Sequence, residues 1–144
     1  MTPNFWRALA LTAVVLAASG CGGDSSTAPQ TLAGTYTLRT VNGTAVPATF
    51  TEAGGSLRIN SGNIVINSGS TFSRTANYTT TVSGQSNTTN SVCTGTYTQN
   101  GNSVSFDEAT SSNPDCGGVY NGTWTNGNTL TVAFDATFQA VFQK

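Results

Sequence analysis

Few side chains in this sequence could carry out acid–base or nucleophilic chemistry. Its 144 residues contain no histidine, five Lys and Arg, and six Asp and Glu, for a net charge of −1. The only lysine is Lys144 at the C-terminus. Neither a Ser/His/Asp nor a Ser/Lys nucleophile can therefore be assembled in the usual way. The scattered basic residues could not neutralise several phosphates, so we expect no nucleic-acid partner.

Carboxylates are the remaining candidates for catalysis or metal binding. Two carboxylates flanking a bond can hydrolyse a glycoside, but Asp107 and Glu108 are adjacent and would face opposite ways on a strand. A calcium site at Asp107, Glu108 and Asp115 is disfavoured because the spacing matches no EF-hand-type loop. We interpret the carboxylates as solvated turn residues and predict a protein that is not an enzyme and needs no metal or cofactor. The carboxylates that we interpret in this way are Glu52, Asp107, Glu108, Asp115 and Asp135.

Cys93 and Cys116 are predicted to form a disulfide. In an exported domain, a bond between them would close a loop of about 24 residues and stabilise the fold by roughly 3.5 kcal/mol. A redox or metal role is disfavoured because the sequence has no Cys-x-x-Cys pair and no histidine.

Cys21 is the third cysteine and is predicted to carry a lipid. Residues 1–20 hold one charge, Arg7, and an apolar run too short to span a bilayer, as in a secretory signal peptide. Ala18-Ser19-Gly20-Cys21 resembles the bacterial lipobox, although Ala18 stands where that motif usually has Leu. The alternative is ordinary cleavage nearby, leaving a stray thiol. With Gly22 next, the resemblance implies outer-membrane anchoring, and residues 21–33 would form the lipidated N-terminus and a polar tether.

The segment from Thr129 to Gln143 is the clearest structural signal. Every even position from Leu130 to Phe142 is apolar, which is the period of a strand with one buried face. A three-residue turn at Asp135 to Thr137 would pair Phe134 with Phe138 and keep all the apolar residues on one face. The sequence therefore predicts a C-terminal hairpin.

Further hairpins are predicted at turn signals upstream. Short alternating segments are separated by the turn signals Asn42-Gly43, Ser61-Gly62, Asn100-Gly101 and 126–128. Asn100-Gly101 would place Tyr97 opposite Val104, and the 126–128 turn would place Trp124 opposite Leu130. We expect loops at 83–91 and 107–117.

Arg74 interrupts the apolar face of the segment 71–82. Either a bulge turns it outward or it points inward as a polar anchor, and we favour the bulge because an unpaired buried charge is costly.

Two hairpins are near copies, beginning Gly95-Thr96-Tyr97 and Gly122-Thr123-Trp124, and Gly34-Thr35-Tyr36 is a partial third. Glycine before an inward aromatic leaves room for a ring across the neighbouring strand. These motifs resemble the lipocalin-like domains of small bacterial lipoproteins, in which an opening Gly-x-Trp stands where this chain has Tyr36. The resemblance covers residues 34–144.

The predicted fold is an all-β, antiparallel up-and-down barrel of about eight to ten short strands, with an immunoglobulin-like sandwich as the alternative. Its interior could form either a ligand cavity or a packed core. The resemblance and the aromatic interior imply a membrane-tethered, non-enzymatic module that binds a small apolar ligand or envelope component. The alternative is a solid barrel that acts through its polar surface and loops. The inward aromatics are Tyr36, Phe72, Tyr78, Tyr97, Phe106, Tyr120, Trp124, Phe134, Phe138 and Phe142.

Overall fold

The computed structural model describes residues 30–144, which form ten β-strands and no helix. The predicted signal peptide, the lipid attachment at Cys21 and most of the tether lie outside the described residues. The strands are β1 Gly34–Val41, β2 Thr44–Ala45, β3 Ala48–Glu52, β4 Gly55–Ile66, β5 Thr71–Val82, β6 Gln85–Asn100, β7 Ser103–Glu108, β8 Gly118–Thr125, β9 Thr129–Ala133 and β10 Gln139–Gln143.

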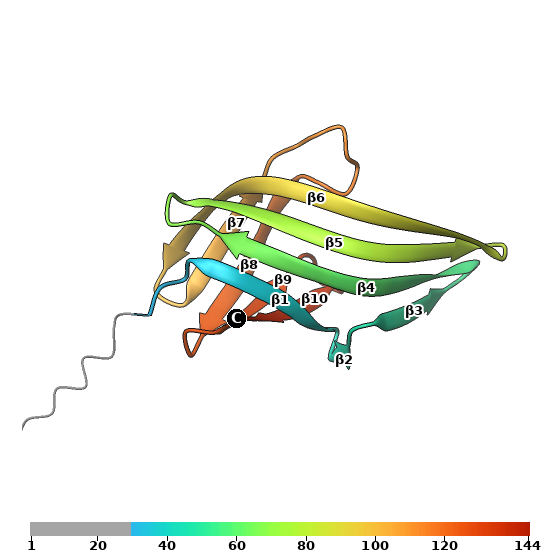
Figure 1. Ribbon diagram of the computed structural model, residues 1–144, viewed down its shortest axis with the longest axis horizontal. Coiled ribbons are helices and arrows are strands. Elements are labelled where there is room, and N and C mark those ends of the chain that lie inside the picture. Colours follow the sequence, from blue (N-terminus) through green and yellow to red (C-terminus); the bar gives the residue numbers. More distant parts are fainter. Residues whose placement is uncertain (1–29) are drawn as a thin grey trace, which may run out of the picture.

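Eight of these strands close into an antiparallel barrel. They lie in the order β1-β10-β9-β8-β7-β6-β5-β4, and pairing of β1 with β4 from Gly34↔Ile66 to Thr37↔Asn63 closes the ring (Figure 1). Closure leaves these strands no free edge along the paired segments. The prediction of an all-β up-and-down barrel is confirmed, and the sandwich alternative is wrong because one continuous sheet holds every strand.

The C-terminal hairpin has the predicted register. Ala140 lies opposite Val132 and Phe142 opposite Leu130, and the Phe134 backbone N–H donates to the Phe138 carbonyl at 3.0 Å. The preceding hairpin also follows the prediction, with Trp124 opposite Leu130. In the hairpin of β6 and β7, however, Tyr97 pairs with Phe106 instead of Val104, since Gly101 and Asn102 form the turn. This two-residue shift leaves the apolar face unchanged.

The predicted turn at Ser61-Gly62 is wrong, because β4 runs without a break through these residues. Its register shifts between Ile59 and Ser61, where Asn60 forms a bulge against β5. The five-residue spacing of Ile59 and Ile64 would otherwise put the two side chains on opposite faces. One extra residue restores a common face, and both side chains are buried.

The predicted loop at 83–91 is also wrong. Ser83 and Gly84, both with positive φ, make a tight turn, and β6 begins at Gln85. Residues 85–90 are polar on both faces, so they lack the alternation that marks a half-buried strand.

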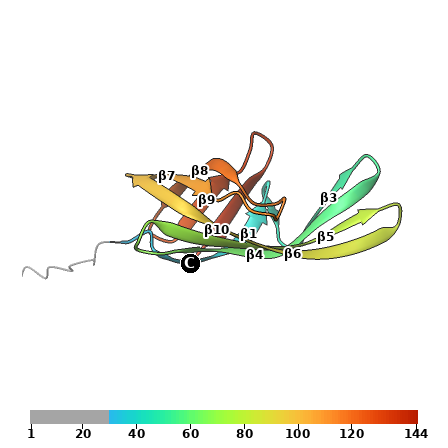
Figure 2. The same cartoon turned by 90° about the horizontal axis from the view of Figure 1, so that it is seen from above.

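The strands β3 to β6 project beyond the barrel, away from the end at which the described chain enters β1 (Figures 1 and 2). We call residues 48–59 and 78–90 of this projection the tongue. β7 pairs with β6 only from Gly95 onward, so the tongue part of β6 has no strand on its outer side among the described residues. β4 and β6 are longer than predicted, with 12 and 16 residues, whereas β5 has the 12 residues of the predicted segment 71–82.

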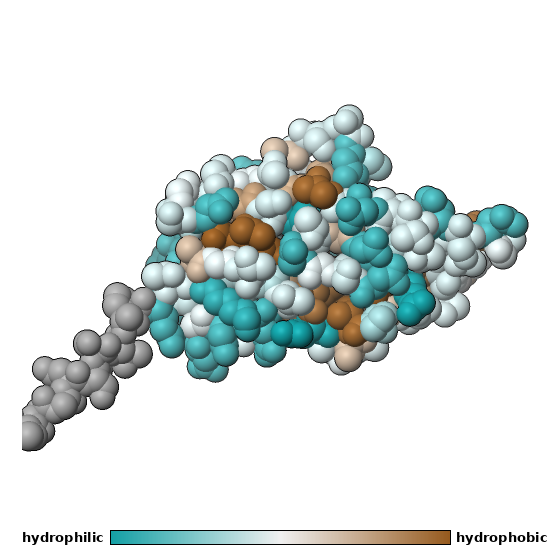
Figure 3. All heavy atoms as spheres, viewed as in Figure 1, coloured by the Kyte–Doolittle hydropathy of each residue, from teal (hydrophilic) through white to brown (hydrophobic). Residues whose placement is uncertain are grey.

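Mostly apolar side chains line the inside of the barrel, whereas the outer surface is mainly Thr, Ser and Asn. Figure 3 shows this face as white and teal with small, separate brown patches. The large apolar residues exposed among those described are Val82, Val92 and Val119.

Gly95 allows Phe72 to pack across β6. A Cβ at Gly95 would clash with the Asp107 carbonyl oxygen and lie 2.8 Å from both the Glu108 Cα and the Phe72 ring. We therefore expect Gly95→Ala to lower the free energy of unfolding by about 1–3 kcal/mol, as overpacking does. Chemical denaturation measures the loss. Gly69→Ala is the matched control, because its Cβ would meet nothing within 4 Å, and equal effects of the two substitutions would contradict the packing argument.

Candidate functional site

The end of the barrel at which the chain enters is closed. Leu32 and Tyr36 are buried there, and the Tyr36 hydroxyl donates to the Leu32 carbonyl at 2.7 Å. Burial raises the pKa of Tyr36. The Lys144 ammonium lies 5.0 Å from the centre of the Tyr36 ring and donates to the Thr31 carbonyl at 2.8 Å. These contacts seal this end with side chains.

The opposite end holds a cavity of about 460 Å³. This volume lies within the range of small-molecule sites in proteins. Most of its wall is apolar, and Arg74 and Asp115 are the charged groups in it. The lining residues are Leu38, Val41, Leu57, Ile59, Gly62, Arg74, Thr75, Ala76, Tyr78, Thr80, Ser91, Asp115, Phe134, Phe138, Ala140 and Phe142.

A row of small side chains explains why this half of the barrel is not filled. Gly62 pairs with Ala76, and Ala76 pairs with Ser91, on the adjacent strands β4, β5 and β6. All three line the cavity. Towards the closed end, Phe72 holds the next inward position from Arg74 on β5 and contacts Phe106, with ring centroids 5.0 Å apart. The change from large to small inward residues along the strands leaves the open space.

Aromatic rings connect the packed half to the cavity. Phe106 stacks on Tyr120 at 5.3 Å between centroids, Tyr120 lies 4.7 Å from Phe134, and Phe134 lies 5.9 Å from Phe138. Such spacings are typical of favourable aromatic pairs. Phe134 and Phe138 stand at the end of this series and line the cavity.

Arg74 points into the barrel, so the favoured prediction of an outward-turning bulge is wrong. β5 is regular at this position, where Arg74 pairs with Ile64 on one side and Cys93 on the other. Its guanidinium makes two charged hydrogen bonds to Glu108, from Nε at 2.9 Å and Nη2 at 3.0 Å. The Arg74 side chain is 14% exposed and that of Glu108 is 1% exposed. The charge is tolerated inside because it is paired and hydrogen-bonded.

Glu108 corrects another prediction, since it is a buried member of β7 and not a solvated turn residue. Besides Arg74, its carboxylate accepts hydrogen bonds from the Tyr120 hydroxyl at 3.1 Å and the Gly117 backbone N–H at 3.1 Å. Burial lowers the pKa of Arg74, but the hydrogen bond and charge of Glu108 outweigh this and raise it above its ordinary value. Burial, and then the charge of Glu108, raise the pKa of Tyr120.

The predicted disulfide is present and attaches the segment 109–117 to the barrel beside this ion pair. Cys93 and Cys116 are bonded, with Cα atoms 5.4 Å apart. The Asp115 carbonyl accepts from Arg74 Nη2 at 3.0 Å. The Asp115 carboxylate accepts from the Tyr78 hydroxyl, and this hydrogen bond, followed by burial, raises the pKa of Tyr78. The segment therefore forms part of the cavity wall.

Two polar residues position the turn that carries the cavity aromatics. Asp135 Oδ1 accepts from the Thr137 and Phe138 backbone N–H groups at 2.6 and 2.8 Å. The Thr137 hydrogen bonds lower the pKa of Asp135. Asn42, at the predicted turn Asn42-Gly43, donates through Nδ2 to the Thr137 carbonyl at 2.9 Å and accepts from the Gln139 N–H at 2.8 Å. The turn is thus fixed to the end of β1.

The structure separates the predicted interior aromatics into two groups. Tyr78, Phe134, Phe138 and Phe142 line the cavity. The others belong to the core or pack against it: Tyr36, Phe72, Tyr97, Phe106, Tyr120 and Trp124. Sequence reasoning did not identify Arg74 and Ser91 as site residues. The available signal was a polar residue at an inward position of an otherwise apolar alternation, which applies to Arg74.

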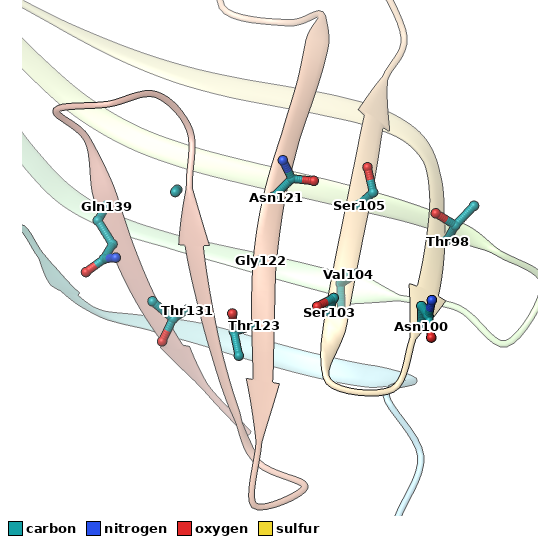
Figure 4. A pocket seen from close by; sticks show the side chains of 11 residues that line it. Thr98, Asn100, Ser103, Val104, Ser105, Asn121, Gly122, Thr123, Thr131 and Gln139 are labelled. Carbon is teal, nitrogen blue, oxygen red and sulfur yellow. The ribbon is translucent and has the colours of Figure 1, made fainter.

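A second depression of about 380 Å³ lies on the outer face of β6 to β10 (Figure 4). Asn121, Ser105 and Thr123 project from its floor, and no charged residue lines it. Its groups are exposed Thr, Ser and Asn side chains that water already solvates, so it offers a ligand less than the largely apolar cavity does.

A metal site is not formed at the one suitable cluster found among residues 30–144. The ligand atoms of Cys93, Glu108 and Cys116 lie within 4.8 Å of one another. Both sulfurs are joined in the disulfide, so neither is a thiolate, which is the form of cysteine that binds metals. The Glu108 carboxylate is held by Arg74.

Comparison with known proteins gives no family assignment, because neither family models nor curated proteins match this sequence significantly. Within residues 30–144 there is no helix long and apolar enough to cross a membrane.

The raised pKa of Tyr120 predicts a loss of stability in alkali. The unfolded chain releases this proton near pH 10, whereas the folded protein retains it. The stability present below pH 10 is therefore lost as the pH rises towards the folded pKa, by about 1.4 kcal/mol per pH unit for one group. Denaturation at several pH values from 9 to 12 should show a shallower decline for Tyr120→Phe. Equal slopes for the two proteins would contradict the assignment.

Proposed function

We propose that this protein is a membrane-tethered, non-enzymatic binding module that holds a small apolar molecule in the open end of its barrel. The cavity of about 460 Å³, with aromatic and aliphatic walls, carries the proposal. A preformed concave apolar site with a few convergent polar groups is the usual form of a small-molecule site. The adjacent disulfide and ion pair hold the wall in place, which reduces the ordering cost of binding.

The arrangement of polar groups supports binding over catalysis. Glu108 is the buried carboxylate nearest the cavity, and Arg74, Tyr120 and the Gly117 N–H donate to it. A carboxylate engaged in this way is poorly placed to accept a proton from a substrate. Asp115 is likewise engaged by Tyr78.

The position of the entering chain supports an orientation in the envelope. The described chain begins at the closed end, next to the buried Leu32, and the tongue projects from the other end (Figure 1). A tether from a lipidated Cys21 would join the barrel at its closed end. The cavity would then open away from the anchoring membrane, where a ligand or partner could reach it.

Filling the cavity should abolish binding. Ala76 points into it from β5, so Ala76→Phe places a ring in the space that the ligand would occupy. We expect the exported protein to bind the uncharged fluorophore N-phenyl-1-naphthylamine, and Ala76→Phe to weaken this binding by at least about tenfold. Fluorescence titration measures both affinities.

Ala133→Phe is the matched control, because Ala133 is an exposed strand alanine on the outer face. It should bind like the wild type. Native mass spectrometry of protein purified from its own envelope should also reveal a bound small molecule. If neither experiment detects a ligand, the binding proposal is wrong. The alternative of a surface interaction protein would then gain support, with the unpaired outer edge of β6 as its clearest contact.

Membrane attachment through Cys21 predicts a simple fractionation result. Cys21→Ala removes the thiol that would carry the lipid, so the protein should move from the membrane to the soluble fraction of the envelope. Immunoblots of separated fractions measure this change. Cys93→Ala, which removes only a disulfide partner, should stay with the membrane. Persistent membrane association of Cys21→Ala would contradict lipid anchoring.

A further inference from the structure

We infer that the cavity selects an apolar ligand carrying an uncharged hydrogen-bond acceptor, such as an ester or amide carbonyl, over a ligand with a carboxylate. This inference rests on the proposed binding function and specifies its ligand class. It follows from the hydrogen bonds of Arg74 and from the charges around the cavity.

Arg74 retains donor capacity that the described protein does not use. A guanidinium has five N–H donors. Nε and Nη2 of Arg74 donate to Glu108, and Nη2 also donates to the Asp115 carbonyl. Among the described residues, no acceptor takes a hydrogen bond from Nη1, and Nη1 keeps some exposed surface. Because Arg74 lines the cavity, we infer that the exposed part of Nη1 faces the cavity and can donate to a ligand.

The orientation of the guanidinium is fixed before a ligand arrives. Its two hydrogen bonds to Glu108 form a fork, and its Cζ lies 5.3 Å from the centre of the Phe134 ring. This combination of a bidentate carboxylate and an aromatic face is specific to arginine. The donor is therefore presented beside an apolar wall without further ordering.

The charges at the site disfavour an anion. Arg74 is the cationic group in the wall, and Glu108 already balances it. Asp115 adds a negative group that also lines the cavity, while Tyr78 and Tyr120 are phenols with raised pKa values and remain neutral near pH 7. A ligand carboxylate would lose its water and meet a site with no net positive charge, which is costly.

A neutral carbonyl meets neither penalty. It accepts from Nη1 and adds no charge, while the apolar remainder of the ligand contacts residues such as Leu57, Ile59 and Phe138. A pure hydrocarbon would displace water from Nη1 and leave the donor unpaired. The expected order of affinity is therefore ester or amide first, with the hydrocarbon and the carboxylate weaker.

Competition among matched probes tests this order. Methyl dodecanoate, dodecanamide, dodecane and dodecanoate share one chain length and differ in the head group. At pH 7, each is used to displace N-phenyl-1-naphthylamine from the exported protein. We expect the ester and the amide to displace the fluorophore at concentrations at least about tenfold lower than dodecanoate requires.

A single substitution should reverse the preference for an uncharged head group. Glu108→Gln removes the charge that balances Arg74 and retains the side-chain size. The variant should gain about tenfold or more in affinity for dodecanoate and change little towards the ester. Asp107→Asn is the matched control, because Asp107 is the adjacent carboxylate on β7 but is exposed. It should leave both affinities unchanged.

The outcomes separate this inference from the proposed function. Displacement by no probe would contradict the binding function itself. Displacement by dodecanoate as readily as by the ester, in the wild type, would overturn the ligand class and leave the binding function standing. If Glu108→Gln does not fold, the wild-type order of affinity still decides, because it does not depend on the variant.

Discussion

The buried pair of Arg74 and Glu108 is the interaction on which the open half of this barrel depends. It joins β5 to the end of β7 over the inner face of β6, and it also contacts the Tyr120 hydroxyl and the backbone of 115–117. Replacing only one member would leave the other charge buried and unpaired, which typically costs about 3–5 kcal/mol. The disulfide from Cys93 to Cys116 then holds the same segment from its other side. The packed interior on one side of this ion pair and the open cavity on its other side both follow from these few contacts.

The sequence was sufficient where a strand has one wet face and one buried face. The alternation from Leu130 to Phe142 determined both the register of the last hairpin and its odd turn length, and the structure has both. The disulfide could also be predicted, because assigning Cys21 to lipid attachment left two cysteines in a domain that was expected to be exported. These inferences used only local periodicity and counting, which do not depend on knowing the neighbours in space.

Sequence reasoning was insufficient where a residue's environment comes from distant strands. Residues 85–90 form a strand with two solvated faces, so their polar composition resembled a loop. In the sequence, the bulge at Asn60 could not be distinguished from a turn, because either one places Ile59 and Ile64 on the same face. Arg74 appeared unpaired because Glu108 lies 34 residues further along the chain. Pairing of β5 with β6 and of β6 with β7 brings the two charges together.

The interior of the barrel is packed in one half and open in the other, and the cause of this difference is the size of the inward residues. Phe72 and Phe106 fill the interior near the closed end, whereas Gly62, Ala76 and Ser91 form a lateral row one side chain beyond Arg74. A barrel of eight strands has an interior just wide enough for side chains to fill, so three adjacent small residues leave unfilled volume. Because this volume adjoins a charged pair with a spare donor, the binding proposed there would depend on chemistry as well as size. The same eight strands therefore combine a core that stabilises the fold with an open cavity, to which we assign the proposed ligand.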